Sequence, residues 1–252
     1  MTNLRRIAFA TLAAPLALAL AACSDDAAEG DLAGEPVAEV APPAGSTWAE
    51  QVSRTDEGGW LIGNPDATIH LVEYGSPTCP ACANFSVNAT QSLHADYIES
   101  GRINFEFRPV PVHGLIDVII IRLLDCGPDS AAIPMADQLW AANAEVTGNF
   151  QANGPALEQA FNLPPEQRFG AVAEAGGLID FFAARGMSRD QATVCLSDPE
   201  AIQALIDRMQ TQNDADNVTS TPTFFLNGQR LNDTGWTAIE PALQRAGARP
   251  AE

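Results

Sequence analysis

Residues 73–85 read E-Y-G-S-P-T-C-P-A-C-A-N-F and place Cys79 and Cys82 with two residues between them. A run rich in strand-forming residues precedes them at residues 69–74, and over residues 85–97 every fourth residue is apolar. This pattern predicts a strand, a turn and a helix, in that order. Cys79 would lie where the helix begins.

The start of a helix is a favourable place for a reactive cysteine. Unpaired N–H groups and the positive end of the helix dipole stabilise a thiolate there and lower its pKa. Pro80 suits the first turn, where its missing N–H costs little. Cys82 follows about one turn later, within reach of the Cys79 sulfur. We therefore expect a redox pair with Cys79 as the exposed attacking sulfur and Cys82 as the buried resolving one.

Two other interpretations of the cysteine pair carry less weight. A CxxC can be half of a zinc site, but the chain has no second CxxC, and its three histidines lack ligand spacing. The pair could also be two inert buried thiols. We favour redox chemistry over both and expect no bound metal.

A second motif, S-T-P-T-F-F-L-N-G, occupies residues 220–228. Pro222 precedes an apolar strand, and Asn227-Gly228 predicts a two-residue hairpin turn. A trans proline that opens an edge strand would explain Pro222 without any function.

Together the two motifs resemble the thioredoxin superfamily and, within it, the DsbA-like thiol oxidoreductases. The resemblance spans residues 59–246 and implies an α/β thioredoxin fold with an inserted all-helical subdomain. In that family the bond before the strand proline is cis and faces the CxxC, so Thr221 and Pro222 would contact an extended substrate. Glu73 matches the buried acid beneath the active site.

The resemblance also implies the role of each residue in exchange. Cys79 would attack or be attacked, and Glu73 would move protons to and from Cys82, although Glu73 could instead point outward at a strand end. Pro80 and Ala81 would contact substrate beside the cysteines. The cysteine pair itself would be the redox group, so no cofactor is expected.

The N-terminal residues are predicted to be a targeting signal rather than part of the fold. Residues 1–22 combine two arginines with an apolar, alanine-rich run, and L-A-A-C at residues 20–23 looks like a bacterial lipobox. Cys23 would then carry lipid and begin the mature chain; an ordinary secretory signal is the alternative. The predicted location is the periplasmic side of the cell envelope, where disulfides can persist.

Composition divides the remaining chain into four segments. Residues 23–58 are rich in Ala, Pro and acidic residues, which predicts a disordered tether. Residues 59–112 would form the first half of the thioredoxin fold, and residues 215–249 the second half. Between them, residues 113–214 lose strand signals and show repeated helix signals, so they are predicted to be the helical subdomain.

Two further cysteines, Cys126 and Cys195, lie near the ends of predicted helices in that subdomain. Setting aside Cys23 leaves four cysteines, and after the CxxC these two are free to pair. The family includes members with a second disulfide in the helical subdomain, which favours a structural bond between them. Two buried free thiols are the alternative.

The charge excludes one class of partner. The formal net charge is −19, and the chain contains no lysine. Binding to nucleic acid is therefore not expected, and attachment to an anionic membrane would depend on lipid at Cys23. Exported cysteine-containing proteins are the expected substrates, and family resemblance implies an integral-membrane redox partner.

The direction of exchange is less clear from sequence than its chemistry. Pro80-Ala81 adds no charge to the active site, so we expect an intermediate reduction potential, with disulfide formation favoured over reduction or isomerisation. A copper carrier that uses the two thiols lacks supporting methionine or histidine clusters. A tethered chaperone without redox turnover is the remaining hypothesis.

Overall fold

The structure is a computed structural model, and it describes residues 32–248. Within these residues, six strands form one sheet in the order β1-β2-β4-β3-β5-β6. The strands are β1 (Val52–Arg54), β2 (Trp60–Gly63), β3 (Ile69–Gly75), β4 (Ile103–Pro109), β5 (Thr223–Leu226) and β6 (Gln229–Arg230). The sheet with its covering helices confirms the predicted α/β fold.

Strand β3 lies in the middle of the sheet. It runs parallel to β4 and antiparallel to β5. Buried strands of this kind are almost continuously apolar, and β3 follows that rule except at His70 and Glu73. Glu73 pairs in register with Phe107 on one side and Phe224 on the other, so its side chain starts from the centre of the sheet.

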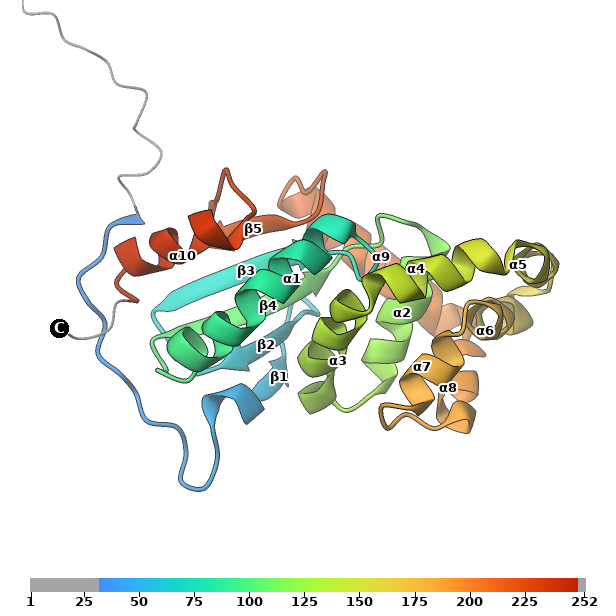
Figure 1. The fold of residues 1–252 in the computed structure, drawn as a ribbon, viewed down its shortest axis with the longest axis horizontal. Helices are drawn as coiled ribbons and strands as arrows, with labels where there is room; N and C mark the ends of the chain where they lie inside the picture. Colours follow the sequence, from blue (N-terminus) through green and yellow to red (C-terminus); the bar gives the residue numbers. More distant parts are fainter. Residues whose placement is uncertain (1–31, 249–252) are drawn as a thin grey trace, which may run out of the picture. The chain divides into compact units, whose positions relative to one another are not determined.

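The chain between β4 and β5 is helical. Figure 1 shows most of these helices gathered beside one end of the sheet, while α1 lies over the sheet itself. The helices between β4 and β5 are α2 (Leu115–Cys126), α3 (Asp129–Ala141), α4 (Asn143–Ala152), α5 (Gly154–Phe161), α6 (Pro165–Ala175), α7 (Leu178–Ala183), α8 (Arg189–Leu196) and α9 (Pro199–Ala215). Helix α1 (Pro80–Ser92) and a π-helical turn (Leu93–Ile98) precede β4, and α10 (Trp236–Arg245) follows β6.

Local sequence explains where several of these helices begin. Ser188 accepts a hydrogen bond from the Gln191 N–H in a capping box before α8. Asp198 accepts a hydrogen bond from the Ala201 N–H at the start of α9, without a capping box, and Pro199 lies in the first turn. The hairpin after β5 turns at Asn227 and Gly228, whose φ angles of 50° and 80° suit a type I′ turn.

The segment before the domain differs from the sequence prediction. Residues 32–58 do not form a free tether, because Val37 N–H donates to Gly247 O at 2.9 Å and Val40 N–H donates to Ser100 O at 3.0 Å. Trp48 is buried, and its indole N–H donates to Val40 O at 2.7 Å. Backbone hydrogen bonds and one tryptophan anchor this segment, and average composition does not reveal such anchors.

The predicted signal and lipidation site lie outside the described residues. Residues 1–22 and Cys23 therefore stay predictions. Within residues 32–248, none of the helices has the length and apolar character needed to cross a bilayer.

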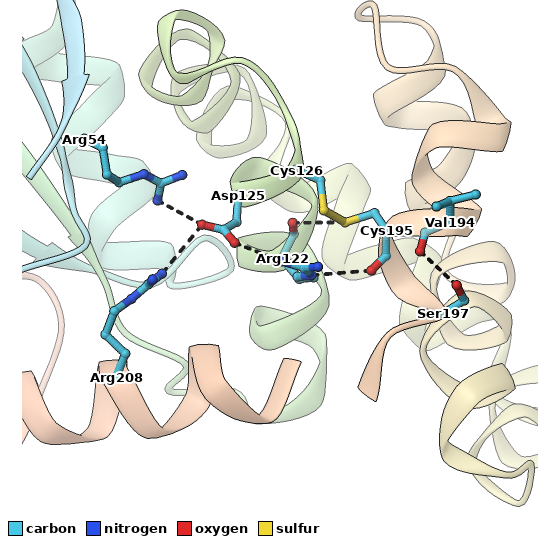
Figure 2. The surroundings of a disulfide bond; sticks show 8 residues. All are labelled: Arg54, Arg122, Asp125, Cys126, Val194, Cys195, Ser197 and Arg208. Carbon is cyan, nitrogen blue, oxygen red and sulfur yellow. Dashed lines mark hydrogen bonds and ion pairs between the residues drawn. A yellow bond between two sulfur atoms is a disulfide. The ribbon is translucent and has the colours of Figure 1, made fainter. Parts of the chain in front are cut away.

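A disulfide joins two helices of the subdomain. Cys126 at the end of α2 is bonded to Cys195 in α8, with Cα atoms 6.1 Å apart. Figure 2 shows Asp125 next to this bond, between Arg54 and Arg208. Asp125 lies 3.0 Å from Arg54 and 3.6 Å from Arg208, so ion pairs connect the end of α2 to β1 and to α9.

The Cys126–Cys195 bond closes a loop across a sequence separation of 69 residues. Replacing both cysteines (Cys126→Ser with Cys195→Ser) should lower the free energy of unfolding by about 4 kcal/mol, because the unfolded chain regains loop entropy. Urea denaturation measures the change. The matched control is Cys79→Ser with Cys82→Ser, which leaves this bond intact; a loss in the test variant below about 1 kcal/mol would contradict the prediction.

Candidate active site

The two cysteines of the CxxC lie at the N-terminus of α1. Cys79 is the N-cap residue, and Pro80 occupies the first turn. Cys79 is 8% exposed, Cys82 is fully buried, and both are free thiols in this structure. Pro80 and Ala81 between them are exposed. Cys79 was expected to be exposed, but it is buried as well and is only slightly more open to solvent than Cys82.

The Thr221–Pro222 motif faces Cys79 across the site. The peptide bond between them is cis, and the Cys79 thiol donates to Thr221 O at 3.4 Å. Residues separated by 142 positions in the chain therefore meet at the sulfur. The buried Thr221 hydroxyl has no hydrogen-bond partner among the described residues, which leaves it free to donate to a thiolate.

The surroundings of Cys79 favour its thiolate. They lower the pKa of the Cys79 thiol to about 5, first through a hydrogen bond from the Cys82 thiol. Burial opposes this effect, while the Thr221 side chain and the backbone N–H groups of Cys82 and Ala81 add to it. These amides belong to the first turn of α1, so the helix start acts as expected.

Cys82 and Glu73 form an enclosed acid–base pair below Cys79. Burial raises the pKa of Cys82, and its hydrogen bond to Cys79 and the charge of Glu73 raise it further. Burial also raises the pKa of Glu73 well above its ordinary value, and a hydrogen bond with Cys82 partly offsets this. Glu73 is 1% exposed, so it does not point outward at a strand end.

A network that the sequence did not predict holds the loop before Cys79. Asp117 on α2 is fully buried and accepts hydrogen bonds from Ser76 Oγ (2.8 Å), Thr78 N (3.2 Å), Thr78 Oγ1 (2.7 Å) and His113 N (2.8 Å). The Trp140 indole donates to Ser76 O at 3.0 Å. The helical subdomain thus fixes the residues that lead into Cys79. The available signal was an acid that directly precedes the mostly apolar run of residues 118–124.

An apolar cavity opens beside the active-site cysteines. Its volume is about 440 Å³. Its lining comes from the Cys79 loop and from α2, α4 and α5: Thr78, Pro80, His113, Ile116, Thr147, Phe150, Gln151, Leu157 and Phe161. The cavity therefore lies between the reactive sulfur and the helical subdomain, where a substrate side chain could enter.

Within residues 32–248, no three His, Cys, Asp or Glu side chains come together in a way that could hold a metal ion. The chemistry that these residues can perform is thiol–disulfide exchange, with one stabilised thiolate, one enclosed thiol and one enclosed carboxyl group.

The reaction of Cys79 with iodoacetamide should follow the thiolate fraction. The rate should be nearly constant above pH 6 and fall about tenfold per pH unit below the pKa of about 5. Thr221→Val removes one donor and should move the midpoint to higher pH, and Cys79→Ser is the blank. A midpoint close to the ordinary thiol value of about 8.5 would show that the donors do not act on this sulfur.

The sequence matches the thioredoxin family over residues 55–245. A putative protein-disulfide oxidoreductase from Rickettsia bellii is 24% identical over 193 residues, which are 77% of this chain and 66% of the relative. The chain spans slightly less than two thirds of the length of this and related Rickettsia proteins. Disulfide bond formation protein D from Bacillus subtilis is 23% identical over 73% of this chain and 75% of its own.

Solved structures give the same fold. A protein-disulfide isomerase from Novosphingobium aromaticivorans is 28% identical, with a TM-score of 0.66 over 74% of this chain and 96% of its own. Wolbachia pipientis alpha-DsbA1 is 16% identical, with a TM-score of 0.61 over 77% of this chain and 93% of its own. The family match covers well over half of the sequence. The chain belongs to the thioredoxin family and has the fold of its DsbA-like members.

Proposed function

We propose that this chain is a protein thiol:disulfide oxidoreductase that transfers its Cys79–Cys82 disulfide to cysteine-containing proteins. The observation that supports the proposal most directly is the difference in pKa between the two thiols. The pKa of Cys79 is lowered to about 5, while burial raises that of Cys82. One sulfur is suited to leave as a thiolate, and the other is kept from competing for substrate.

The same asymmetry supports disulfide formation over reduction. A pair becomes more oxidising when its reduced form is stabilised, and a stabilised thiolate does this. A pKa of about 5 lies between those of thioredoxin, about 7, and DsbA, about 3.5. We infer a moderately oxidising pair, with reductase or isomerase activity as the alternative.

Exchange proceeds in two balanced steps. A substrate thiolate attacks Cys79 Sγ, the Cys79–Cys82 bond breaks, and Cys82 leaves and takes a proton. The second substrate thiolate then attacks the substrate sulfur of the mixed disulfide and releases Cys79 as a thiolate. Two electrons pass from substrate to enzyme, and the substrate gains one disulfide.

The surroundings of Cys79 support a polypeptide as substrate. The Thr221 backbone lies next to the sulfur and offers groups that an extended peptide could pair with. The apolar cavity of about 440 Å³ could take one side chain near the substrate cysteine. Pro80 and Ala81 are exposed on the same surface.

The proposed location and partners are inferred from the amino-acid sequence. We propose an exported chain that is anchored by lipid on Cys23, faces the periplasm and is reoxidised by an integral-membrane partner. The names of the Rickettsia and Bacillus relatives refer to disulfide oxidoreduction and disulfide bond formation, which supports the disulfide chemistry in this proposal. A net charge of −19 argues against nucleic acid as a partner.

Mixing the oxidised protein with a reduced two-cysteine peptide tests the function. The peptide should gain a disulfide while Cys79 and Cys82 become thiols, as read by mass after thiol labelling. Cys82→Ser should stop at a mixed disulfide through Cys79, and Cys79→Ser should not react.

A chain that leaves the peptide reduced at pH 7 would contradict the proposal. If the Cys79→Ser, Cys82→Ser double variant still suppressed aggregation of an unfolded protein, the chaperone hypothesis would be favoured. Stoichiometric copper binding by the reduced chain would favour the metal carrier instead.

A further inference from the structure

Polar side chains recur at every fourth residue along α1. Starting from Cys82, they are Ser86, Thr90 and, just beyond the helix, His94. Residues four apart lie above one another on a helix surface, so these side chains form one row. Helix α1 packs against α3, and Figure 1 shows the two helices side by side. The row faces α3, because Asp137 on α3 contacts three of its members.

Three oxygen atoms form a triangle between the two helices. Ser86 Oγ lies 3.1 Å from Asp137 Oδ1, Thr90 Oγ1 lies 3.2 Å from the same Oδ1, and the two hydroxyl oxygens are 3.1 Å apart. All three sides are within hydrogen-bond distance. The other carboxyl oxygen of Asp137 lies 3.9 Å from His94 Nε2.

The triangle can hold a proton without moving a heavy atom. When Asp137 is ionised, both hydroxyls donate to Oδ1, and their own contact is not a hydrogen bond. When Oδ1 carries a proton, it can donate to Ser86, Ser86 to Thr90, and Thr90 back to Oδ1, which satisfies all three contacts. Rotation of the hydroxyl groups alone converts one arrangement into the other.

Exposure increases along this row from the core to the surface. Cys82 is fully buried and Ser86 is 5% exposed, whereas the side chains of Asp137 and His94 are 21% and 23% exposed. His94 lies in the π-helical turn, whose i→i+5 hydrogen bond joins Glu99 N to His94 O at 3.0 Å. Water can therefore reach His94 at the outer end of the row and Asp137 beside it on α3.

The inner end of the row is Cys82, which shares its buried site with the Glu73 carboxyl group. Glu73 is 1% exposed, and its Oε1 has no hydrogen-bond partner among the described residues. After burial, the charge of Asp137 is the largest influence that raises the pKa of Glu73, so the two carboxyl groups are electrostatically coupled. Burial also raises the pKa of Asp137, which helps it to hold a proton.

We propose that Asp137, with Ser86 and Thr90, is the proton station that connects the buried Cys82–Glu73 pair to solvent. The inference rests on the proposed function, since it concerns the proton that exchange delivers to Cys82. Asp137 does not touch substrate or the reacting sulfurs. Its role is to supply a proton to Glu73, which then protonates Cys82.

The proton balance follows the first exchange step. The substrate thiolate forms a bond to Cys79 Sγ, the Cys79–Cys82 bond breaks, and Cys82 leaves with the electron pair. The Cys82 thiolate takes a proton from protonated Glu73. No hydrogen bond joins Ser86 to Glu73 among the described residues. The proton that Asp137 returns to the Glu73 carboxylate would therefore cross this gap on a water molecule, and solvent near His94 then reprotonates Asp137.

The titratable groups coupled to Asp137 come from two elements: Glu73 on β3 and His94 in the π-helical turn. Glu99 also acts on His94. On β1, which also packs against α3, Arg54 is paired with Asp125 and Asp129. The protonation of Asp137 is therefore expected to depend mainly on Glu73 and His94.

A stopped-flow experiment tests the proposal. It measures how fast a reduced peptide opens the Cys79–Cys82 disulfide at pH values from 4 to 9. Asp137→Asn should slow this step about tenfold at pH 7 and change the shape of the pH profile, since acid–base groups contribute at least that much. Asp137→Glu should restore most of the rate. Asp129→Asn, which removes an exposed carboxylate from the same helix, is the matched control and should react as the wild type does.

A second measurement does not depend on a variant that folds. Opening of the disulfide in the wild-type protein should be slower in D2O than in H2O at a matched thiolate fraction of the peptide, because protons pass through exchangeable hydroxyl and carboxyl groups in this step. Equal rates in the two solvents, or an Asp137→Asn rate and pH profile equal to the wild type, would overturn the inference while leaving the proposed function intact. A loss that is uniform at all pH values and that Asp137→Glu does not rescue would show a structural role only and would also overturn it. A wild-type protein that does not react would overturn the proposed function itself.

Discussion

Stabilisation of the Cys79 thiolate at the start of α1 is the interaction on which the site depends. It needs a helix that begins at Cys79, an amide from Ala81, and a Cys82 thiol that can donate a hydrogen bond. It also needs Thr221 to approach from a distant part of the chain. The sheet supplies both conditions, because β3 leads into α1 and its neighbour β5 follows directly after Pro222.

The inserted helices complete the site rather than merely enlarging the protein. Through Asp117 on α2 and Trp140 on α3, they fix the loop that leads into Cys79. They also provide most of the wall of the neighbouring cavity. The Cys126–Cys195 bond ties α2 to α8, so a covalent link holds together the subdomain that positions the loop. Stability of the helices and geometry of the active site are therefore connected.

Sequence was sufficient for the features that depend on local spacing. The Cys79–Cys82 motif, the strand that precedes it and the Asn227-Gly228 turn are short-range patterns, and the structure contains each of them. The cis bond before Pro222 was expected only through family resemblance, because composition and periodicity say nothing about a peptide isomer.

Features that depend on contacts between distant residues were not predictable in this way. Asp117 lies in an apolar run, and no spacing rule connects it to Thr78. The docking of residues 37–48 against the domain depends on backbone groups and on Trp48, whereas the surrounding composition indicates disorder. Asp137 was missed for the same reason, since its partners lie on another helix.

The reduction potential of the Cys79–Cys82 pair tests the account most directly. The protein would be equilibrated with glutathione buffers, and its thiols would be counted by mass spectrometry after labelling. The Cys126→Ser, Cys195→Ser double variant would check that only one pair titrates. A stabilised Cys79 thiolate predicts a potential between those of DsbA, about −120 mV, and protein disulfide isomerase, about −180 mV. A value near that of thioredoxin, about −270 mV, would contradict an oxidising pair.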